Sequence, residues 1–249
     1  MSIFIDSHVH SYPSYRPDVF FGAFRAAVRA SGASVGAFVL AQREGQTVFE
    51  DWSAGKGLPE GTDVAVREDG ALRLAFPDGE PDIIVVAGRQ IACAERIEIL
   101  SIGSTEGLPD GSPIADAIED ALRREALPVL AWGVGKWWFS RAKTVASLLH
   151  RFAPDELLLG DSSLRPVFWG EPAAMAEART LGRRVLHGSD PLPPAFEETR
   201  AGQYGDLAGA TIDPERPLRA QMLAILRNDE LVPTGRRAGL LQFFKRMKG

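Results

Sequence analysis

Residues 2–10 read SIFIDSHVH. Residues 2–5 are mostly apolar and predict a first β-strand. Side chains two residues apart along a strand point to the same side, so we expect Asp6, His8 and His10 on one face at the strand's carboxyl end. Two imidazoles and a carboxylate in this arrangement can bind one divalent ion. The stretch therefore predicts a strand that delivers metal ligands to its end.

The rest of the chain repeats one order, in which a short apolar run is followed by a polar or glycine break and an amphipathic run. Strands are predicted over residues 34–40, 83–86, 96–102, 128–132, 156–160 and 184–188, and helices over 18–31, 113–125, 139–152, 172–181, 215–228 and 236–248. Residues 63–67 and 71–76 alternate around Glu68-Asp69-Gly70, which is typical of a β-hairpin. Strands that alternate with helices indicate βα units and a parallel sheet.

We therefore expect an α/β fold in a single domain over residues 1–249. It would be a (β/α) barrel of regular, distorted or seven-stranded form, with the hairpin as an insertion. Barrels of this class often have this length. The composition, 45% hydrophobic and 24% charged, is that of a globular protein. No apolar run reaches the roughly 18 residues of a membrane span and no basic leader precedes residue 6, so the expected location is cytoplasmic.

The net charge of −5 predicts that nucleic acid is not a partner, because nucleic-acid-binding proteins usually carry a basic surface. It still allows a local basic pocket. The single cysteine, Cys93, excludes an intrachain disulfide and a thiolate zinc cage, and we expect it to be a small buried strand residue.

Polar side chains follow several of the predicted strands, where parallel α/β folds place their functional groups. The cations among them are Arg89, Lys136, Arg141 and Arg165, and the acids are Asp161 and Asp190. Guanidinium groups bind phosphate or carboxylate oxygens bidentately, so the three arginines are predicted to bind an anionic substrate. Lys136 follows two glycines that allow close approach of the backbone. It is interpreted as an anion-binding lysine, with a carbamylated metal-bridging lysine or a lysine packed between aromatics as alternatives.

The D-x-H-x-H end of the first strand resembles the opening motif of the amidohydrolases and of PHP (polymerase and histidinol phosphatase) domains. Residues 185–193, VLHGSDPLP, are similar to their last motif, in which an apolar strand runs into G-S-D. Residues 84–103, IVVAGRQIACAERIEILSIG, are similar to the PHP pattern of a strand, G-x-E-I and a returning strand. The resemblance implies a barrel that holds one to three divalent ions at the strand carboxyl ends, with Asp190 as a ligand.

Three positions depart from the PHP pattern. Gln90 stands where the family has a metal-bridging glutamate, residues 130–133 lack the family's His-Pro, and Pro191 follows Asp190 where a histidine is common nearby. We therefore expect one divalent ion, Mn, Zn or Fe, held by His8, His10 and Asp190. His187 is left open between a core histidine and a residue at the mouth of the site.

The leading hypothesis is a metal-dependent hydrolase that acts on a small anionic molecule. A phosphoester is the first substrate class, and an amide or lactone is the second. Asp161 or Asp6 would act as general base, and Lys136 would clamp the anion. The alternative is a relative that has lost catalysis and binds an anionic ligand or a partner protein. Residues 239–249 are basic and amphipathic, and they predict a helix that packs on the barrel or forms a homo-oligomer through a second subunit.

Overall fold

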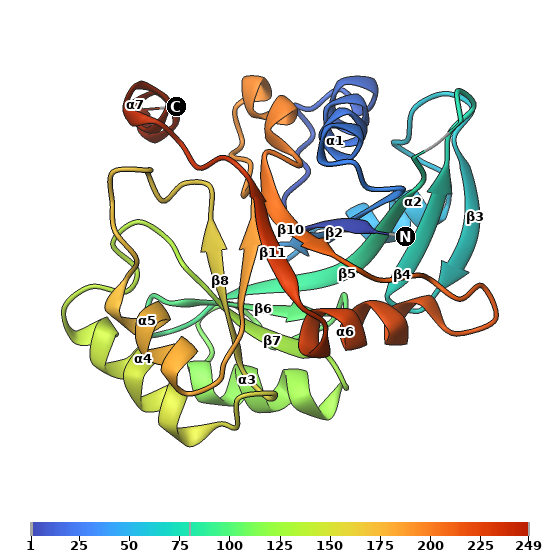
Figure 1. The fold of residues 1–249 in the computed structure, drawn as a ribbon. Helices are drawn as coiled ribbons and strands as arrows, with labels where there is room; N and C mark the ends of the chain where they lie inside the picture. The colour runs from blue at the N-terminus through green and yellow to red at the C-terminus, as the bar shows by residue number, and fades with distance from the viewer. Residues whose placement is uncertain (1, 80, 249) are drawn as a thin grey trace.

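A mixed, nearly closed sheet organises the computed structural model, which describes residues 2–79 and 81–248 (residues 247 and 248 by their backbone alone) (Figure 1). Its strands are β1 (Ile3–Val9), β2 (Val35–Gln42), β3 (Asp63–Glu68), β4 (Ala71–Ala75), β5 (Ile83–Ala92), β6 (Glu98–Ile102), β7 (Leu127–Ala131), β8 (Leu158–Ser162), β9 (Val185–Gly188), β10 (Tyr204–Ala208) and β11 (Leu231–Gly235). The helices are α1 (Pro17–Ser31), α2 (Val48–Ser53), α3 (Ile114–Arg123), α4 (Ser140–Arg151), α5 (Ala173–Thr180), α6 (Leu218–Asn228) and α7 (Leu240–Lys248), with a 3-10 turn η1 (Ala195–Arg200).

The strands follow the order β11-β10-β1-β2-β5-β6-β7-β8-β9, and the hairpin of β3 and β4 joins this path at β5. β1, β2 and β5 are parallel, as are β7, β8 and β9. β6 is antiparallel to both of its neighbours, and β10 is antiparallel to β1 and β11. The predicted α/β class and the hairpin are confirmed. A regular (β/α) barrel is not confirmed, because β6 and β10 interrupt the parallel order.

Several strand boundaries differ from those predicted, and three of these differences bear on the site. β1 continues through His8, β5 continues through Arg89 and Gln90, and β8 includes Asp161. Polar residues at these strand ends do not stop the ladder, because backbone groups and not side chains make it. The sequence analysis missed α2, β10 and β11.

The ends of β1 and β9 lie against each other. They bring the D-x-H-x-H motif of residues 6–10 together with the G-S-D motif of residues 188–190. The Ser7 hydroxyl donates to the His187 carbonyl over 2.8 Å, and the Asp190 N–H donates to the His8 carbonyl over 2.8 Å. A Cβ on Gly188 would lie 2.5 Å from the His8 Cβ, so only glycine allows this approach. Residues far apart in the chain thus share one rim of the sheet.

The interior of the sheet is apolar, and α6 closes the end at which the parallel strands begin. Leu218, Met222 and Leu226 of α6 join Ile3 and Leu158 in one buried cluster. Outside, α1 and α2 cover β1, β2 and β5, while α3, α4 and α5 cover β6, β7 and β8 (Figure 1). The carboxyl ends of the parallel strands are therefore the rim where polar groups can collect. No helix within residues 2–79 and 81–248 is long and apolar enough to cross a membrane.

Candidate metal centre

A β-bulge near the end of β1 sets the direction of the histidines. Asp6 pairs with Phe38 and Val9 pairs with Leu40, so β1 spans three residue steps where β2 spans two. The extra residue breaks the alternation of side chains, and bulges of this kind commonly re-aim residues beside functional sites. The expectation of one shared face is therefore wrong for Asp6. His8 and His10 converge, whereas Asp6 turns toward Ser189.

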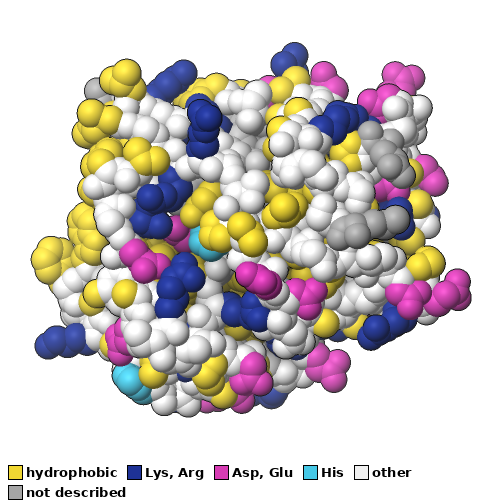
Figure 2. Space-filling view, viewed as in Figure 1, with side chains coloured by type: hydrophobic (Ala, Val, Ile, Leu, Met, Phe, Trp, Pro, Cys, Tyr) yellow, Lys and Arg dark blue, Asp and Glu magenta, His cyan; other side chains and the backbone are white. Residues whose placement is uncertain are grey.

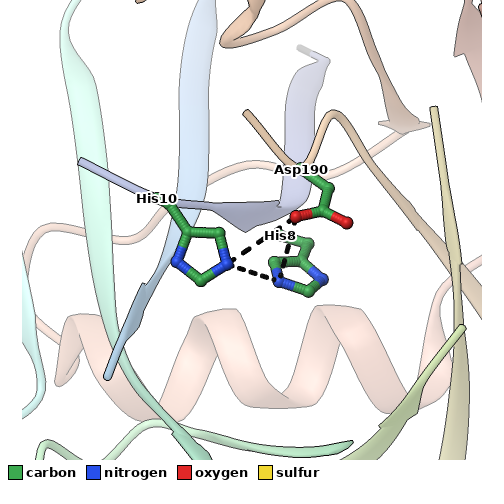
Figure 3. A group of neighbouring side chains, drawn as sticks. All are labelled: His8, His10 and Asp190. Carbon is green, nitrogen blue, oxygen red and sulfur yellow. Dashed lines mark hydrogen bonds and ion pairs between the residues drawn. The ribbon is translucent and has the colours of Figure 1, made fainter. Parts of the chain in front are cut away.

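His8, His10 and Asp190 bring three ligand atoms together (Figure 3). The two Nε2 atoms lie 3.1 Å apart, and each lies 3.7 Å from Oδ1 of Asp190. A tetrahedral ion with bonds of about 2.1 Å spaces its ligands by about 3.4 Å. The three predicted ligands therefore fit one face of a tetrahedron, and they support a divalent metal.

Asp190 is held in an unusual backbone conformation. Its φ is 49°, a left-handed value that is costly for a residue with a Cβ. Besides its N–H contact with His8, its carbonyl accepts from Nη2 of Arg246 over 2.8 Å, and its Oδ2 accepts from the Ser162 hydroxyl over 3.1 Å. These contacts fix the direction of the carboxylate.

The charges around the site keep its ligands in the states that bind metal. Burial alone would raise the pKa of Asp190, but its electrostatic interactions with the imidazoles of His8 and His10 and with Arg246 outweigh burial and hold the pKa below its usual value. Burial, together with the charge of His8, lowers the pKa of His10 to about 3. At neutral pH the site therefore presents an ionised carboxylate and a neutral imidazole at His10.

Asp6 lies behind the ligands and joins three segments. Its Oδ1 accepts from the backbone N–H of Ser189 over 2.8 Å and of His8 over 3.2 Å. Its Oδ2 accepts from the Ser189 hydroxyl over 2.5 Å and from the N–H of Gly202 over 2.9 Å. Burial raises the pKa of Asp6 to about 7, against the lowering effect of these hydrogen bonds. The contacts favour a positioning role over the predicted role as a base.

Gln90 lies beside the metal ligands, at the position where PHP domains have a glutamate. Its Oε1 lies 2.9 Å from Nε2 of His8, the same nitrogen that faces the other two ligands. An amide oxygen can complete a coordination shell but adds no charge. The position therefore belongs to the site, although its side chain is neutral.

The predicted base Asp161 and the predicted substrate residue Arg165 are paired with each other. Nε and Nη2 of Arg165 donate to the Asp161 carboxylate over 2.8 and 2.5 Å, and Nη1 donates to the carbonyls of Trp169 and Gly170. The Tyr204 hydroxyl donates to the same carboxylate over 3.3 Å. These contacts neutralise both charges within the structure, and neither side chain contacts the three ligands.

The remaining predicted cations divide into two groups. Lys136 is one-third exposed, forms an ion pair with Glu98, and contributes to lowering the pKa of Asp190, which places its charge near the site. Arg141 donates to the carbonyls of residues 135 and 136 and holds the loop that carries Lys136. Arg89 is buried and lies 3.4 Å from a carboxylate oxygen of Asp110. Of these three, only Lys136 is brought toward the ligands.

Two further cations beside the site were missed. Arg43 follows β2, lies 5.8 Å from the centroid of the Tyr12 ring, and contributes to lowering the pKa of His10. Its position directly after a strand is the same signal that marks the predicted cations. Arg246 reaches the site from α7, and no local sequence signal marks it. His187 is a core residue whose Nδ1 lies 2.6 Å from Oδ1 of Asp206.

The burial of Cys93 determines the reactivity of its thiol, and a first prediction follows from it. The thiol is free and buried, and burial raises its pKa to about 12. Because the thiolate is the reactive form, we expect negligible alkylation of the folded protein at pH 8 and rapid alkylation after unfolding in urea. Counting modified thiols by mass spectrometry checks this. Equal rates in both states would contradict the burial.

No protein-family model and no curated protein matches the chain in sequence. Solved structures of similar fold include PsfC from Pseudomonas syringae, with a TM-score of 0.64 at 10% identity over 99% of this chain and 95% of that one. A lesion-specific endonuclease Q from Pyrococcus furiosus aligns with a TM-score of 0.54 at 14% identity, over 94% of this chain and 59% of that one. A complex of endonuclease Q with a 27-mer duplex substrate gives 0.53 at 14% identity, over 94% and 60%.

These structures are 10–14% identical to this chain and share its fold, so the predicted resemblance is confirmed at the level of the fold alone. The chain spans about three-fifths of endonuclease Q. In the DNA complex an abasic lesion lies at the active site of that enzyme. The expectation of a small anionic substrate without nucleic acid is therefore wrong, because this fold accommodates a nucleic acid and a negative net charge does not exclude one.

Proposed function

We propose that this protein is a divalent-metal-dependent hydrolase that cleaves phosphodiester bonds in nucleic acid. The observation that carries the proposal is the buried triangle of His8, His10 and Asp190, whose spacing suits one ion. Imidazole and carboxylate ligands favour Zn, Mn or Fe. The PHP-like folds of the similar structures, one of them bound to DNA, support the reaction class and the substrate class.

A divalent ion at this site would lower the pKa of a water molecule and polarise a phosphoryl oxygen. The chain supplies the surrounding charges. Lys136 and Arg43 act on Asp190 and His10 from separate loops, so both can face a phosphate between them. Glu98 pairs with Lys136 and can keep that lysine in place until a phosphate replaces it.

The face of the molecule in Figure 2 carries no broad basic area, which favours a small number of phosphate contacts there. Figure 2 shows Lys and Arg mixed with Asp and Glu on the side viewed there, without a large area of one sign. Each neutralised phosphate of a single strand contributes about −0.7 to the slope of log affinity against log salt. With Lys136 and Arg43 as the two contacts, we expect a slope of about −1.4, measured by fluorescence anisotropy with a labelled oligonucleotide in chelator.

The direct test uses purified protein loaded with Mn, Zn or Fe and labelled single-stranded and duplex oligonucleotides, with and without an abasic position. We expect strand cleavage that a chelator stops and that added metal restores. Protein that binds metal stoichiometrically but cleaves none of these substrates would overturn the proposal.

Replacing the neutral Gln90 gives a second prediction at the same site. In Gln90→Glu a carboxylate would lie beside Nε2 of His8, so we expect metal to bind about tenfold or more tightly. Isothermal titration with Mn measures the change. Gln203→Glu, directly before β10 and away from the ligands, is the control and should leave the affinity unchanged. If Gln90→Glu also has no effect, residue 90 lies outside the coordination shell.

A further inference from the structure

Four of the chain's five tryptophans gather in one pocket on the rim of the sheet. Trp132 follows β7, Trp137 and Trp138 lie in the loop before α4, and Trp169 lies in the loop after β8. Together with Arg165, Gly170 and Pro172 they line a cavity of about 180 Å³, which we name the tryptophan pocket.

The rings of the tryptophan pocket are not stacked face to face on one another. Trp132 and Trp169 meet at 80° with centroids 6.3 Å apart, and Trp138 and Trp169 meet at 57° with centroids 5.8 Å apart. These rings are tilted, and none of these pairs is stacked face to face. Trp132 and Trp137 are buried, whereas Trp138 is 46% exposed. The pocket thus has a fixed inner wall and an accessible outer wall.

Two features of the loop before α4 cost folding free energy, which is typical of a loop that forms a binding site. Nε1 of Trp137 is buried and has no hydrogen-bond partner in the described part of the chain. Phe139 adopts φ 56° and ψ −126°, strained values for a bulky residue, while its side chain is 84% exposed. Unsatisfied donors and strained backbone concentrate at binding sites.

The tryptophan pocket is connected to the metal ligands through two adjacent residues of β8. Arg165 in the pocket wall donates to Asp161, and the next residue, Ser162, donates through its hydroxyl to Asp190. Lys136, whose charge acts on Asp190, lies in the same loop as Trp137 and Trp138. A molecule with a phosphate at the metal site could therefore extend a neighbouring group into the pocket.

The chemistry of the walls selects the ligand. A cavity of about 150 Å³ accepts one benzene ring, so 180 Å³ has room for a single small ring system and not for a whole nucleotide. Arg165 is the charged group in the wall, and Asp161 neutralises it. The described residues that line the pocket include no carboxylate to balance the charge of a cationic ligand, while indole faces favour a flat aromatic one.

Resting on the proposed function, we propose that the tryptophan pocket binds one unpaired nucleobase of the substrate strand by stacking against Trp138 and Trp169. The base would be unpaired, because a base pair exceeds the size of the cavity. The pocket would then fix which phosphodiester, counted from the bound base, lies at the metal site.

The experiment uses tryptophan fluorescence in the variant Trp52→Phe, in which all four remaining tryptophans line the pocket. Trp52 packs in the separate aromatic core of Phe20 and Phe38. The probes are a short oligodeoxythymidylate and an abasic sugar-phosphate strand of equal length, both added in chelator so that no cleavage occurs. We expect saturable quenching by the thymidylate strand alone. Adding Trp138→Ala should raise its Kd by about 5- to 100-fold, and Trp138→Phe should restore most of the binding.

The outcomes separate the pocket from the proposed reaction. Equal quenching by both strands would overturn base stacking, and metal-dependent cleavage would still stand as a separate result. Base-dependent quenching without cleavage in any metal would support the pocket and overturn the hydrolase. Quenching by tetramethylammonium that competes with the thymidylate strand would show a cation pocket and overturn the proposal, as would unchanged Kd in Trp138→Ala.

Discussion

Asp190→Asn is expected to remove metal from the protein and lower cleavage by roughly a thousandfold or more, because the metal provides both the activated water and the charge on the phosphoryl oxygen. The substitution keeps the shape of the side chain and deletes the only carboxylate among the three ligands. His8→Ala should have the same effect, since Nε2 of His8 lies within 3.7 Å of both other ligand atoms. Elemental analysis and cleavage assays measure the two losses.

The control for this prediction is His150→Ala. His150 lies on α4, is exposed, and pairs with Glu177 at 3.1 Å, so its loss removes an imidazole without touching the site. This variant should retain full metal content and activity. If Asp190→Asn keeps stoichiometric metal, the ion binds elsewhere and the assigned triangle is wrong.

The sequence predicted the elements of the fold better than their arrangement. Hydrophobic periodicity located the described α-helices other than α2 and most of the parallel strands, because it reports which faces are buried. It could not show that β6 runs antiparallel to β7, since strand direction depends on pairing between distant segments. β10 was missed because its sequence, YGDLA, contains a glycine and an acid that are buried only in the folded protein.

The metal ligands were predictable and most of their surroundings were not. His8, His10 and Asp190 fall in short motifs, and their chemistry is visible without a structure. The role of Asp6 depends on a one-residue bulge, and bulges leave no reliable mark in sequence. Of the three predicted arginines, Arg165 follows a strand directly, but whether a guanidinium faces a substrate or an internal carboxylate depends on distances of a few ångströms. Arg165 illustrates this, because its partner Asp161 comes from the same strand end.

The second large effect is expected at Arg246, which joins the C-terminal helix to the metal site. Its guanidinium is fully buried and contacts Glu197 at 2.8 Å, the Ser163 hydroxyl at 2.8 Å and the Asp190 carbonyl at 2.8 Å. The sequence predicted α7 from its apolar residues, and Phe243 does pack against Trp169. The contact between α7 and the metal site is made by the buried Arg246, which donates to the carbonyl of Asp190.

Arg246→Met should therefore lower both stability and metal affinity. Removing Arg246 leaves the buried Glu197 carboxylate with Arg200, at 3.9 Å, as its remaining cationic partner among the described residues, which costs up to about 3–5 kcal/mol in free energy of unfolding. It also releases the carbonyl of Asp190, whose left-handed backbone depends on its contacts, so we expect metal to bind about 10- to 100-fold more weakly. Urea unfolding in chelator and titration with Mn measure the two effects separately.

The double variant Arg246→Met, Glu197→Gln distinguishes the two roles of Arg246. Neutralising Glu197 removes the buried charge that has lost its Arg246 partner, so most of the lost stability should return. Metal affinity should stay low, because Asp190 still lacks the donor to its carbonyl. Recovery of both quantities together would mean that Arg246 affects the metal only through overall stability, and α7 would then have no specific part in positioning Asp190.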